Sequence, residues 1–222
     1  MFTIYHYPLC PKSRLIRCLL KEQDIEFTLK QVDYWKDKDK ILSLDVLGEI
    51  PIITTPSKRN ISSLYAIIEY MMELSAHAHH SAYTIDERAD MRRIIYWINT
   101  RFHGEVTDYI VNEKLIKLLT SFDSPRVEFI RAAKVNFTHH AKYFQNLISA
   151  HGNLISNNIT VADIFLACHL SVLDYFGEVH WDNFQILKEW YALVKSQPYF
   201  RKILTDRIAI LKPPPHYENL DF

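Results

Sequence analysis

The stretch Phe2–Arg17, FTIYHYPLCPKSRLIR, decides the fold of the N-terminal part of this chain. Its first half predicts a short β-strand, which Pro8 ends because proline cannot donate to a strand ladder. Its second half predicts a helix, since apolar residues recur at helical spacing from Leu15 onward. Cys10 therefore falls where the strand gives way to the helix, and Pro11 suits the first helical position.

The position of Cys10 favours a reactive thiol. A helix N-terminus offers unpaired N–H groups and the positive end of the helix dipole, which stabilise a thiolate. The alternative is that Cys10 is a small buried hydrophobe, which is the common role of a cysteine outside a disulfide. These residues alone leave both interpretations open.

The composition describes an ordinary globular protein. Of 222 residues, 48% are hydrophobic and 23% charged, which suffices for a real core in one large domain or two modest ones. Lysine plus arginine number 26, as do aspartate plus glutamate, so nothing indicates a nucleic-acid binder. The cysteines, Cys10, Cys18 and Cys168, are too few and too widely spaced for a disulfide framework.

We expect a cytoplasmic protein. The chain begins without the pattern of a signal peptide, and no apolar run approaches the ~18 residues that a membrane span needs. Direct membrane insertion is therefore not expected.

The first part of the chain predicts a compact α/β unit. A second strand is expected over Glu26–Val32 with Leu29 facing the core, and Ile50–Pro51 leads into an apolar strand over Ile52–Thr55. Proline is permitted at a strand start, and an X-Pro bond there can be cis. Ser62 and Ser63 can then cap a helix.

Trp35 precedes a run of alternating charges, Lys36–Lys40, which predicts a solvated surface. Trp35 either folds back onto the core or stays exposed as a partner contact, since tryptophan is enriched at binding hot spots.

Residues 74–84 lose the pattern and predict an interdomain linker, and everything after them until the tail predicts helices. The histidines of the linker, His77, His79 and His80, lack the partners of a dedicated metal site, so no metal is expected. Thr160 and Asp163 resemble a capping box. The helix that they start is apolar on nearly all sides and should be the buried centre of its domain, with Cys168 and His169 in the core.

The C-terminal tail differs from a disordered end. Pro213–Pro215 favour extended polyproline conformation, yet the chain then closes on aromatic and apolar residues. One alternative is that the tail packs back onto the body. The other, which we predict, is that the tail is presented to a partner through Tyr217, Leu220, Asp221 and Phe222.

Together these features resemble the glutathione S-transferase family across essentially the whole chain. The resemblance rests on four motifs, Cys10–Pro11–x–Ser13, Ile50–Pro51, Ala66–Ile67–x–x–Tyr70 and Thr160–Val161–Ala162–Asp163. It implies an α/β N-terminal thioredoxin-like domain (1–76), an all-α C-terminal helical bundle (85–205) and an extended proline-rich tail (206–222). It also implies a homodimer.

The resemblance implies roles for particular residues. Cys10 or Ser13 would stand where the family activates the glutathione thiol, Pro51 would follow a cis bond, and the Ile50 backbone would bind the cysteinyl part of glutathione. Ser63 could donate a hydrogen bond. However, Ser63 and Leu64 replace the acidic residue and serine that hold the γ-glutamyl end, so glutathione is expected as a weak ligand or co-substrate at most.

A narrower likeness, strongest in the tail, is to an alphaproteobacterial branch of the family that binds filaments of the tubulin homologue FtsZ. This likeness implies a non-catalytic adaptor of cell division. The alternative is a glutathione S-transferase or a glutathione-dependent thiol oxidoreductase that uses Cys10, with Cys18 too distant to be a resolving partner.

Overall fold

A computed structural model describes residues 1–74, 83–121 and 123–220 of the chain. Its internal contacts divide the chain into two compact units. The first comprises Met1–Thr84 and Pro198–Ile208, and the second comprises Ile85–Gln197 and Ala209–Phe222. The predicted helical domain ran to residue 205, so the structure differs there by placing Pro198–Ile208 in the first unit.

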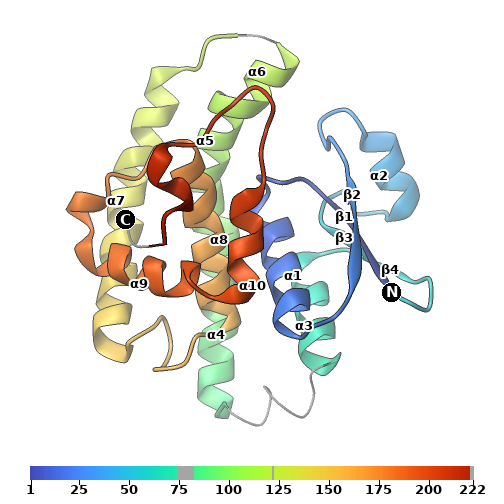
Figure 1. Cartoon of the computed structure of the whole chain (residues 1–222), viewed down its shortest axis with the longest axis horizontal. Helices are drawn as coiled ribbons and strands as arrows, with labels where there is room; N and C mark the ends of the chain where they lie inside the picture. Colours follow the sequence, from blue (N-terminus) through green and yellow to red (C-terminus); the bar gives the residue numbers. More distant parts are fainter. Residues whose placement is uncertain (75–82, 122, 221–222) are drawn as a thin grey trace. The chain divides into compact units, whose positions relative to one another are not determined.

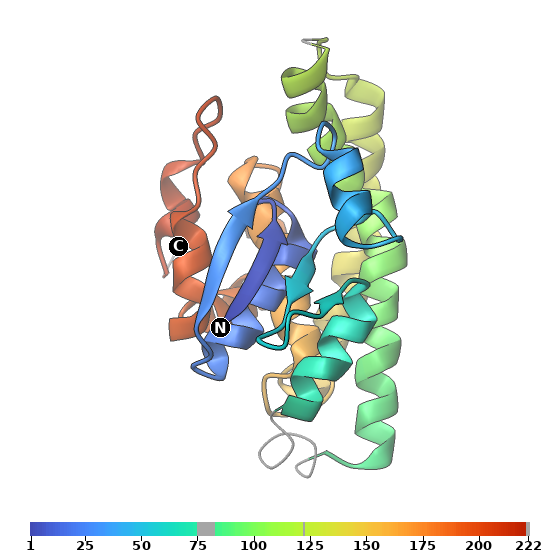
Figure 2. The same ribbon diagram turned by 90° about the vertical axis from the view of Figure 1, so that its right-hand side faces the viewer.

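The first unit is built on a mixed four-stranded sheet in the order β2-β1-β3-β4 (Figure 2). The parallel pair is β1 (Phe2–His6) with β2 (Phe27–Gln31). The antiparallel strands are β3 (Ile52–Thr54) and β4 (Asn60–Ile61). This is the predicted thioredoxin-like α/β arrangement, although β4 lies in a segment that was not expected to form a strand.

Helices cover both faces of this sheet. Figure 1 shows α1 (Pro11–Glu22) and α3 (Leu64–Leu74) on one face and α2 (Lys38–Leu44) on the other. The prediction that Leu29 faces the core is wrong, because β2 is an edge strand and Leu29 is largely exposed. Part of the predicted charged surface run forms α2, whose one buried residue is Ile41.

The segment that returns to the first unit packs on α1. It contains α10 (Pro198–Arg201) and a 3₁₀ turn, η5 (Lys202–Thr205). The Arg17 guanidinium donates two hydrogen bonds to the Asp206 carboxylate, at 2.7 and 2.9 Å. Such a bidentate pair is among the stronger polar contacts in proteins and ties the segment to the helix that follows Cys10.

The second unit is helical, as predicted. Its first helical stretch comprises α4 (Ile85–Trp97), α5 (Asp108–Val111) and α6 (Lys117–Thr120), joined by π-helical segments η2 (Ile98–Thr107) and η3 (Asn112–Ile116). The others are α7 (Val127–His151), α8 (Val161–Tyr175), α9 (Gln185–Lys195) and the 3₁₀ turns η4 (Trp181–Asn183) and η6 (Pro215–Glu218).

The centre of this unit is α8. Thr160 and Asp163 form the predicted capping box, and every residue of the helix from Ala162 to Tyr175 is buried. The hydroxyl of Thr107 and Nδ1 of His169 lie 2.8 Å apart in a buried hydrogen bond. The predicted core placement of Cys168 and His169 is therefore confirmed.

None of the helices in the described part of the chain combines the length and apolar character that a membrane crossing requires.

Candidate functional site

Cys10 stands at the junction that the sequence indicates. It is the N-cap residue of α1 in extended conformation, with φ −91° and ψ 115°, and Pro11 begins the helix. The Cys10 carbonyl accepts the first helical hydrogen bond from the Arg14 N–H at 3.0 Å. The Cys10 side chain is half-buried, whereas Cys18 and Cys168 are fully buried. Of the three thiols, Cys10 is therefore the one that solution can reach.

The Ile50–Pro51 peptide bond is cis, as the resemblance implies. Antiparallel pairing of Tyr5 with Ile52 puts the start of β3 beside the end of β1. An ion pair of 3.5 Å between Lys12 and Glu49 joins the first turn of α1 to the loop before Pro51. The structure thus brings the cysteine turn and the cis-proline turn to the same end of the sheet.

Ser63 reaches this end of the sheet through β4. Because Ile53 pairs with Ile61 in antiparallel register, the chain runs back toward the start of β3 before α3 begins. Ser63 has φ +67°, a strained conformation for a residue other than glycine, and such strain is common where a site is held in place. Its carbonyl accepts the Ile67 N–H at 3.0 Å.

Ser13 and Leu64 differ in what they offer this site. The Ser13 hydroxyl is fully buried in the first turn of α1 and has no hydrogen-bond partner within the described residues. A buried, unpaired hydroxyl is unusual and leaves its hydrogen-bonding capacity unused. Leu64 is buried at the start of α3 and has no polar group to donate. The serine of the family's recognition pair therefore has no substitute at this position.

The environment of Trp35 combines the two alternatives, core packing and exposure, that the sequence left open. It is half-buried, with its ring edge-on to Tyr7 at 4.9 Å and to Tyr34 at 5.0 Å. Tyr7 is buried in the loop that leads to Cys10. Trp35 therefore supports that loop while part of its ring stays exposed, and its role as a partner contact stays a prediction.

The charge near the end of β1 is arranged around His6. Burial, together with the Arg17 guanidinium, lowers the pKa of His6 to about 4. His6 is therefore neutral at neutral pH. The charged groups that act on it are the paired Arg17 guanidinium and Asp206 carboxylate.

The predicted presentation of the whole tail to a partner is wrong for Tyr217. Tyr217 is 0% exposed, and its ring packs edge-on against Tyr175 with centroids 5.2 Å apart. Pro214 is extended, but the 3₁₀ turn η6 begins at Pro215, and Tyr217 within this turn is buried in the helical unit. Leu220 is half-buried and stays a predicted contact, whereas Asp221 and Phe222 lie outside the described residues.

A buried polar network that the sequence did not reveal holds the tail. Oδ1 of Asp174 accepts the Trp181 indole N–H at 2.8 Å and lies 2.9 Å from Nε2 of His216. The Lys195 ammonium donates to the His216 carbonyl at 3.4 Å. Burial lowers the pKa of Lys195 to about 8, and the negative charge of Asp174 opposes that shift.

Among the described residues, no group of three histidine, cysteine, aspartate or glutamate side chains is placed to hold a metal ion. The linker histidines, His77, His79 and His80, lie outside the described residues.

Comparison with known proteins places these features in context. The model of the N-terminal domain of glutathione S-transferases matches residues 4–79. FtsZ-localized protein A of Caulobacter vibrioides is 36% identical to this chain over 223 aligned residues, which cover 99% of this chain and 98% of that protein.

Solved structures extend the similarity to three dimensions. A glutathione S-transferase from Rhodospirillum rubrum F11 has a TM-score of 0.94 at 36% identity and covers 100% of both chains. FzlA from C. crescentus has a TM-score of 0.93 at 35% identity, covering 100% of this chain and 99% of that one.

Proposed function

Because this chain belongs to the glutathione S-transferase superfamily, in the group that includes FtsZ-localized protein A, we propose that it is a non-catalytic adaptor of bacterial cell division that binds FtsZ filaments. The observation that carries this proposal is the similarity to FtsZ-localized protein A along the entire length of the chain. A cytoplasmic protein that gathers at the division site fits this function.

The geometry around α3 supports an adaptor over a transferase. A glutathione ammonium needs a carboxylate partner, and neither Ser63 nor the buried Leu64 supplies one. The nearby Asp45 carboxylate already accepts hydrogen bonds from the Ser62 hydroxyl and the Leu47 N–H. The glutathione ammonium would therefore lose water on binding without gaining an ion pair, so glutathione should bind weakly.

A second candidate function is a glutathione-dependent thiol enzyme. It is favoured by the half-buried thiol of Cys10 at a helix N-terminus, close to a cis-proline turn. The free hydroxyl of Ser13 in the same helical turn adds to it. This function requires glutathione to bind despite the missing carboxylate.

Co-sedimentation with FtsZ from the same bacterium tests the proposal. We expect the chain to pellet with filaments formed in GTP and to stay in the supernatant with FtsZ in GDP. The Cys10→Ser variant should pellet equally, because an adaptor does not use the thiol. Calorimetry should find glutathione binding in the millimolar range or weaker.

The competing outcome is equally clear. A chain that ignores filaments but binds glutathione at micromolar concentration, and loses turnover of an aromatic electrophile in the Cys10→Ser variant, is an enzyme rather than an adaptor.

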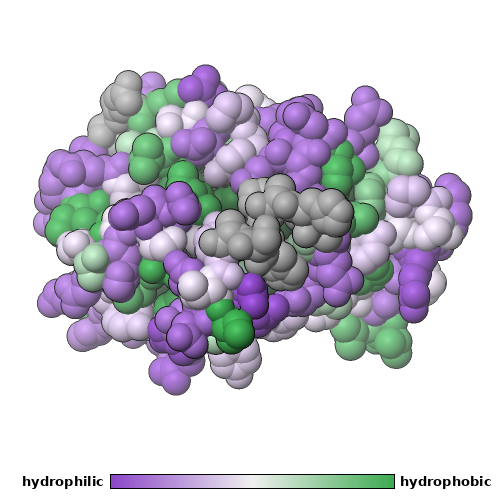
Figure 3. Space-filling view, turned by 90° about the horizontal axis from the view of Figure 1, so that it is seen from below, coloured by the Kyte–Doolittle hydropathy of each residue, from purple (hydrophilic) through white to green (hydrophobic). Residues whose placement is uncertain are grey.

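We also propose that the chain forms a homodimer, and an apolar knob on the first unit, formed by Val46 and Leu47 after α2, supports this. On the face drawn in Figure 3, hydrophobic side chains form separate patches among hydrophilic ones. Two apolar residues that are adjacent in the sequence after α2 are both exposed, Val46 at 85% and Leu47 at 57%. Large exposed apolar patches mark contact surfaces, and we propose that these two side chains belong to one.

Charging this knob should separate the subunits. We expect the double variant Val46→Asp with Leu47→Asp to sediment as a monomer at tens of micromolar, where the parent chain sediments as a dimer. Leu193→Asp on α9 is the matched control, since Leu193 is also about half exposed but lies elsewhere. A parent chain that is monomeric at this concentration contradicts the proposal.

A further inference from the structure

The edge strand β2 has backbone groups without partners. It lies at the end of the sheet and pairs with β1 alone. The Val32 N–H donates to the His6 carbonyl at 2.9 Å, and successive residues of a strand point their backbone groups to opposite sides. The N–H and C=O groups of Phe27, Leu29 and Gln31 therefore face away from β1. Among the described residues, none of these groups has a hydrogen-bond partner.

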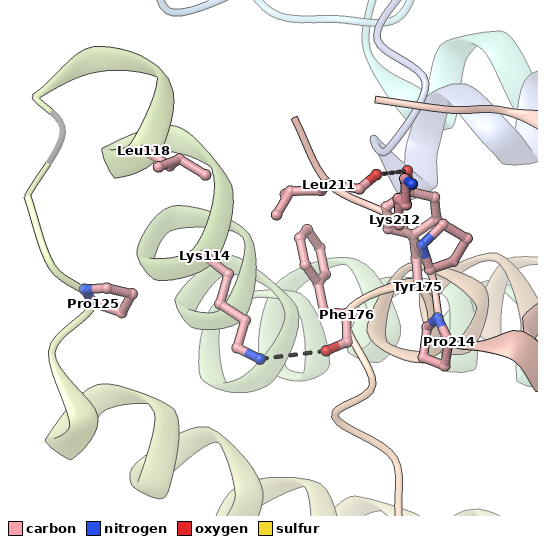
Figure 4. A pocket seen from close by; sticks show the side chains of 9 residues that line it. Lys114, Leu118, Pro125, Tyr175, Phe176, Leu211, Lys212 and Pro214 are labelled. Carbon is pink, nitrogen blue, oxygen red and sulfur yellow. Dashed lines mark hydrogen bonds between the residues drawn. The ribbon is translucent and has the colours of Figure 1, made fainter. Parts of the chain in front are cut away.

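In the helical unit, by contrast, side chains cap two backbone carbonyls of irregular segments. The Tyr175 hydroxyl donates to the Leu211 carbonyl at 2.8 Å, and the Lys114 ammonium donates to the Phe176 carbonyl at 3.3 Å (Figure 4). The outer edge of β2 has no such cap within the part of the chain that the structure describes, and residues 28–31 are all exposed. An exposed row of unpaired strand groups is a template for another strand.

The sequence of this edge is complementary to itself. In two copies of the strand that run antiparallel with Thr28 opposite Thr28, Glu26 of each copy lies opposite Lys30 of the other. Phe27 likewise lies opposite Leu29, which is 41% exposed. Opposite charges and apolar side chains that face each other across an antiparallel pair stabilise it. Glu26 and Lys30 are both exposed, and neither has an ion-pair partner among the described residues.

The backbone of β2 fits the same register. Phe27 and Leu29 carry the outward-facing N–H and C=O groups, so they form the hydrogen-bonded pairs of this arrangement. Thr28 then forms the non-hydrogen-bonded pair on the two-fold axis. The Lys30 ammonium lies over the Tyr5 ring, 5.3 Å from its centroid, so the sheet already orders the side chain that the pairing uses.

We propose that β2 is a contact surface for a second copy of this chain, with which it forms an antiparallel strand pair centred on Thr28. Two four-stranded sheets then join into one continuous sheet. A contact of so few residues falls below the standard interface size of about 1,600 Å² and is weak, so it adds to the homodimer built on the apolar knob rather than replacing it. Because each contact joins identical surfaces, a chain that uses both links dimers into a longer row.

Disulfide trapping tests the register. The Cα atoms of a non-hydrogen-bonded antiparallel pair are about 4.5 Å apart, which a disulfide can span. In a Cys10→Ser background the remaining cysteines, Cys18 and Cys168, are fully buried. Thr28→Cys in this background should yield a covalent dimer on mild oxidation at tens of micromolar. Gln31→Cys is the matched control, because position 31 is also exposed but its two copies lie roughly 20 Å apart in this register.

Charge reversal tests the pairing of Glu26 with Lys30. Adding Lys30→Glu to Thr28→Cys should lower the yield of covalent dimer at least about threefold, because two pairs of like charges then face each other. Adding Glu26→Lys as well should restore the yield, because each pair is then attractive again with its signs exchanged. Lys36→Glu, in the exposed turn after β2, is the charge control and should leave the yield unchanged.

Circular dichroism melts verify that each variant is folded. The proposal is overturned if Thr28→Cys gives no more covalent dimer than Gln31→Cys. It is also overturned if Lys30→Glu alone and Lys30→Glu with Glu26→Lys give equal yields. No FtsZ is present in these experiments, so their outcome is separate from the test of the adaptor function.

Discussion

Replacing Tyr217 with alanine is expected to lower the free energy of unfolding by about 3–5 kcal/mol, the cost typical of deleting a buried aromatic side chain. Tyr217 stands close to the C-terminus, where side chains usually contribute little to stability. Here its ring is 0% exposed and packs edge-on against Tyr175, itself buried at the end of α8. Truncation therefore leaves a cavity beside the central helix.

A thermal melt followed by circular dichroism measures this loss. For a chain of this size, about 3 kcal/mol corresponds to a fall in Tm of roughly 6–12 °C. Asn219→Ala is the matched control, since Asn219 is exposed two residues further along. If Tyr217→Ala melts within about 2 °C of the parent, the ring is not structural. The interpretation of Tyr217 as a partner anchor would then return.

The tail illustrates where sequence patterns reach their limit. The prolines predict an extended segment, which is correct for Pro214, with φ −59° and ψ 154°, and wrong for Pro215, which begins η6. An extended segment can nevertheless lead toward solvent or back onto the protein, and local sequence does not distinguish the two. The contact between Asp174 and His216, which are 42 residues apart in the chain, helps to hold the tail against the protein. No periodicity or spacing links such a pair.

Features that arise from neighbouring residues could be predicted. The strand-to-helix change at Cys10 and the capping box at Thr160 each follow from a few adjacent side chains, and both are present. The family resemblance added the cis bond before Pro51. By contrast, the pair between Arg17 and Asp206 joins residues 189 apart, and it explains why Pro198–Ile208 belongs to the first unit.

The candidate thiol site divides in the same way. The family resemblance, rather than a local pattern, implied that Cys10, Ser13 and Pro51 belong to one site. It could not show that the Ser13 hydroxyl is buried with no hydrogen-bond partner among the residues that the structure describes, or that Ser63 has a positive φ. Both properties depend on how α1 and α3 pack against the sheet rather than on the residues beside them.

Asp163→Ala is the second variant with a large expected effect. The two carboxylate oxygens of Asp163 accept three hydrogen bonds, from the Leu154 N–H at 2.9 Å, the Thr160 N–H at 2.8 Å and the Thr160 hydroxyl at 2.6 Å. All of these groups are buried. Removing the acceptor leaves two backbone N–H groups unsatisfied, at about 1–3 kcal/mol each.

We therefore expect Asp163→Ala to lose about 3–5 kcal/mol of unfolding free energy near neutral pH, as judged by urea denaturation. Asp182→Ala is the control, because Asp182 is an exposed carboxylate in the same unit. Equal stability of the two variants would mean that the capping box contributes little to the fold.

The size of the loss should depend on pH in a defined direction. Burial raises the pKa of Asp163 from 3.8 to about 6, because the hydrogen bonds from Thr160 and Leu154 offset only part of the desolvation. Between these values the folded state binds the proton more tightly than the unfolded state. The stability that Asp163 contributes is therefore greatest below about pH 4 and falls as the pH rises through about 6, by up to roughly 3 kcal/mol.

Urea denaturation of the parent and Asp163→Ala should show a larger difference in unfolding free energy at about pH 4.5 than at about pH 7. A difference that instead grows with pH would show that the hydrogen bonds outweigh burial and that the carboxylate is ionised throughout.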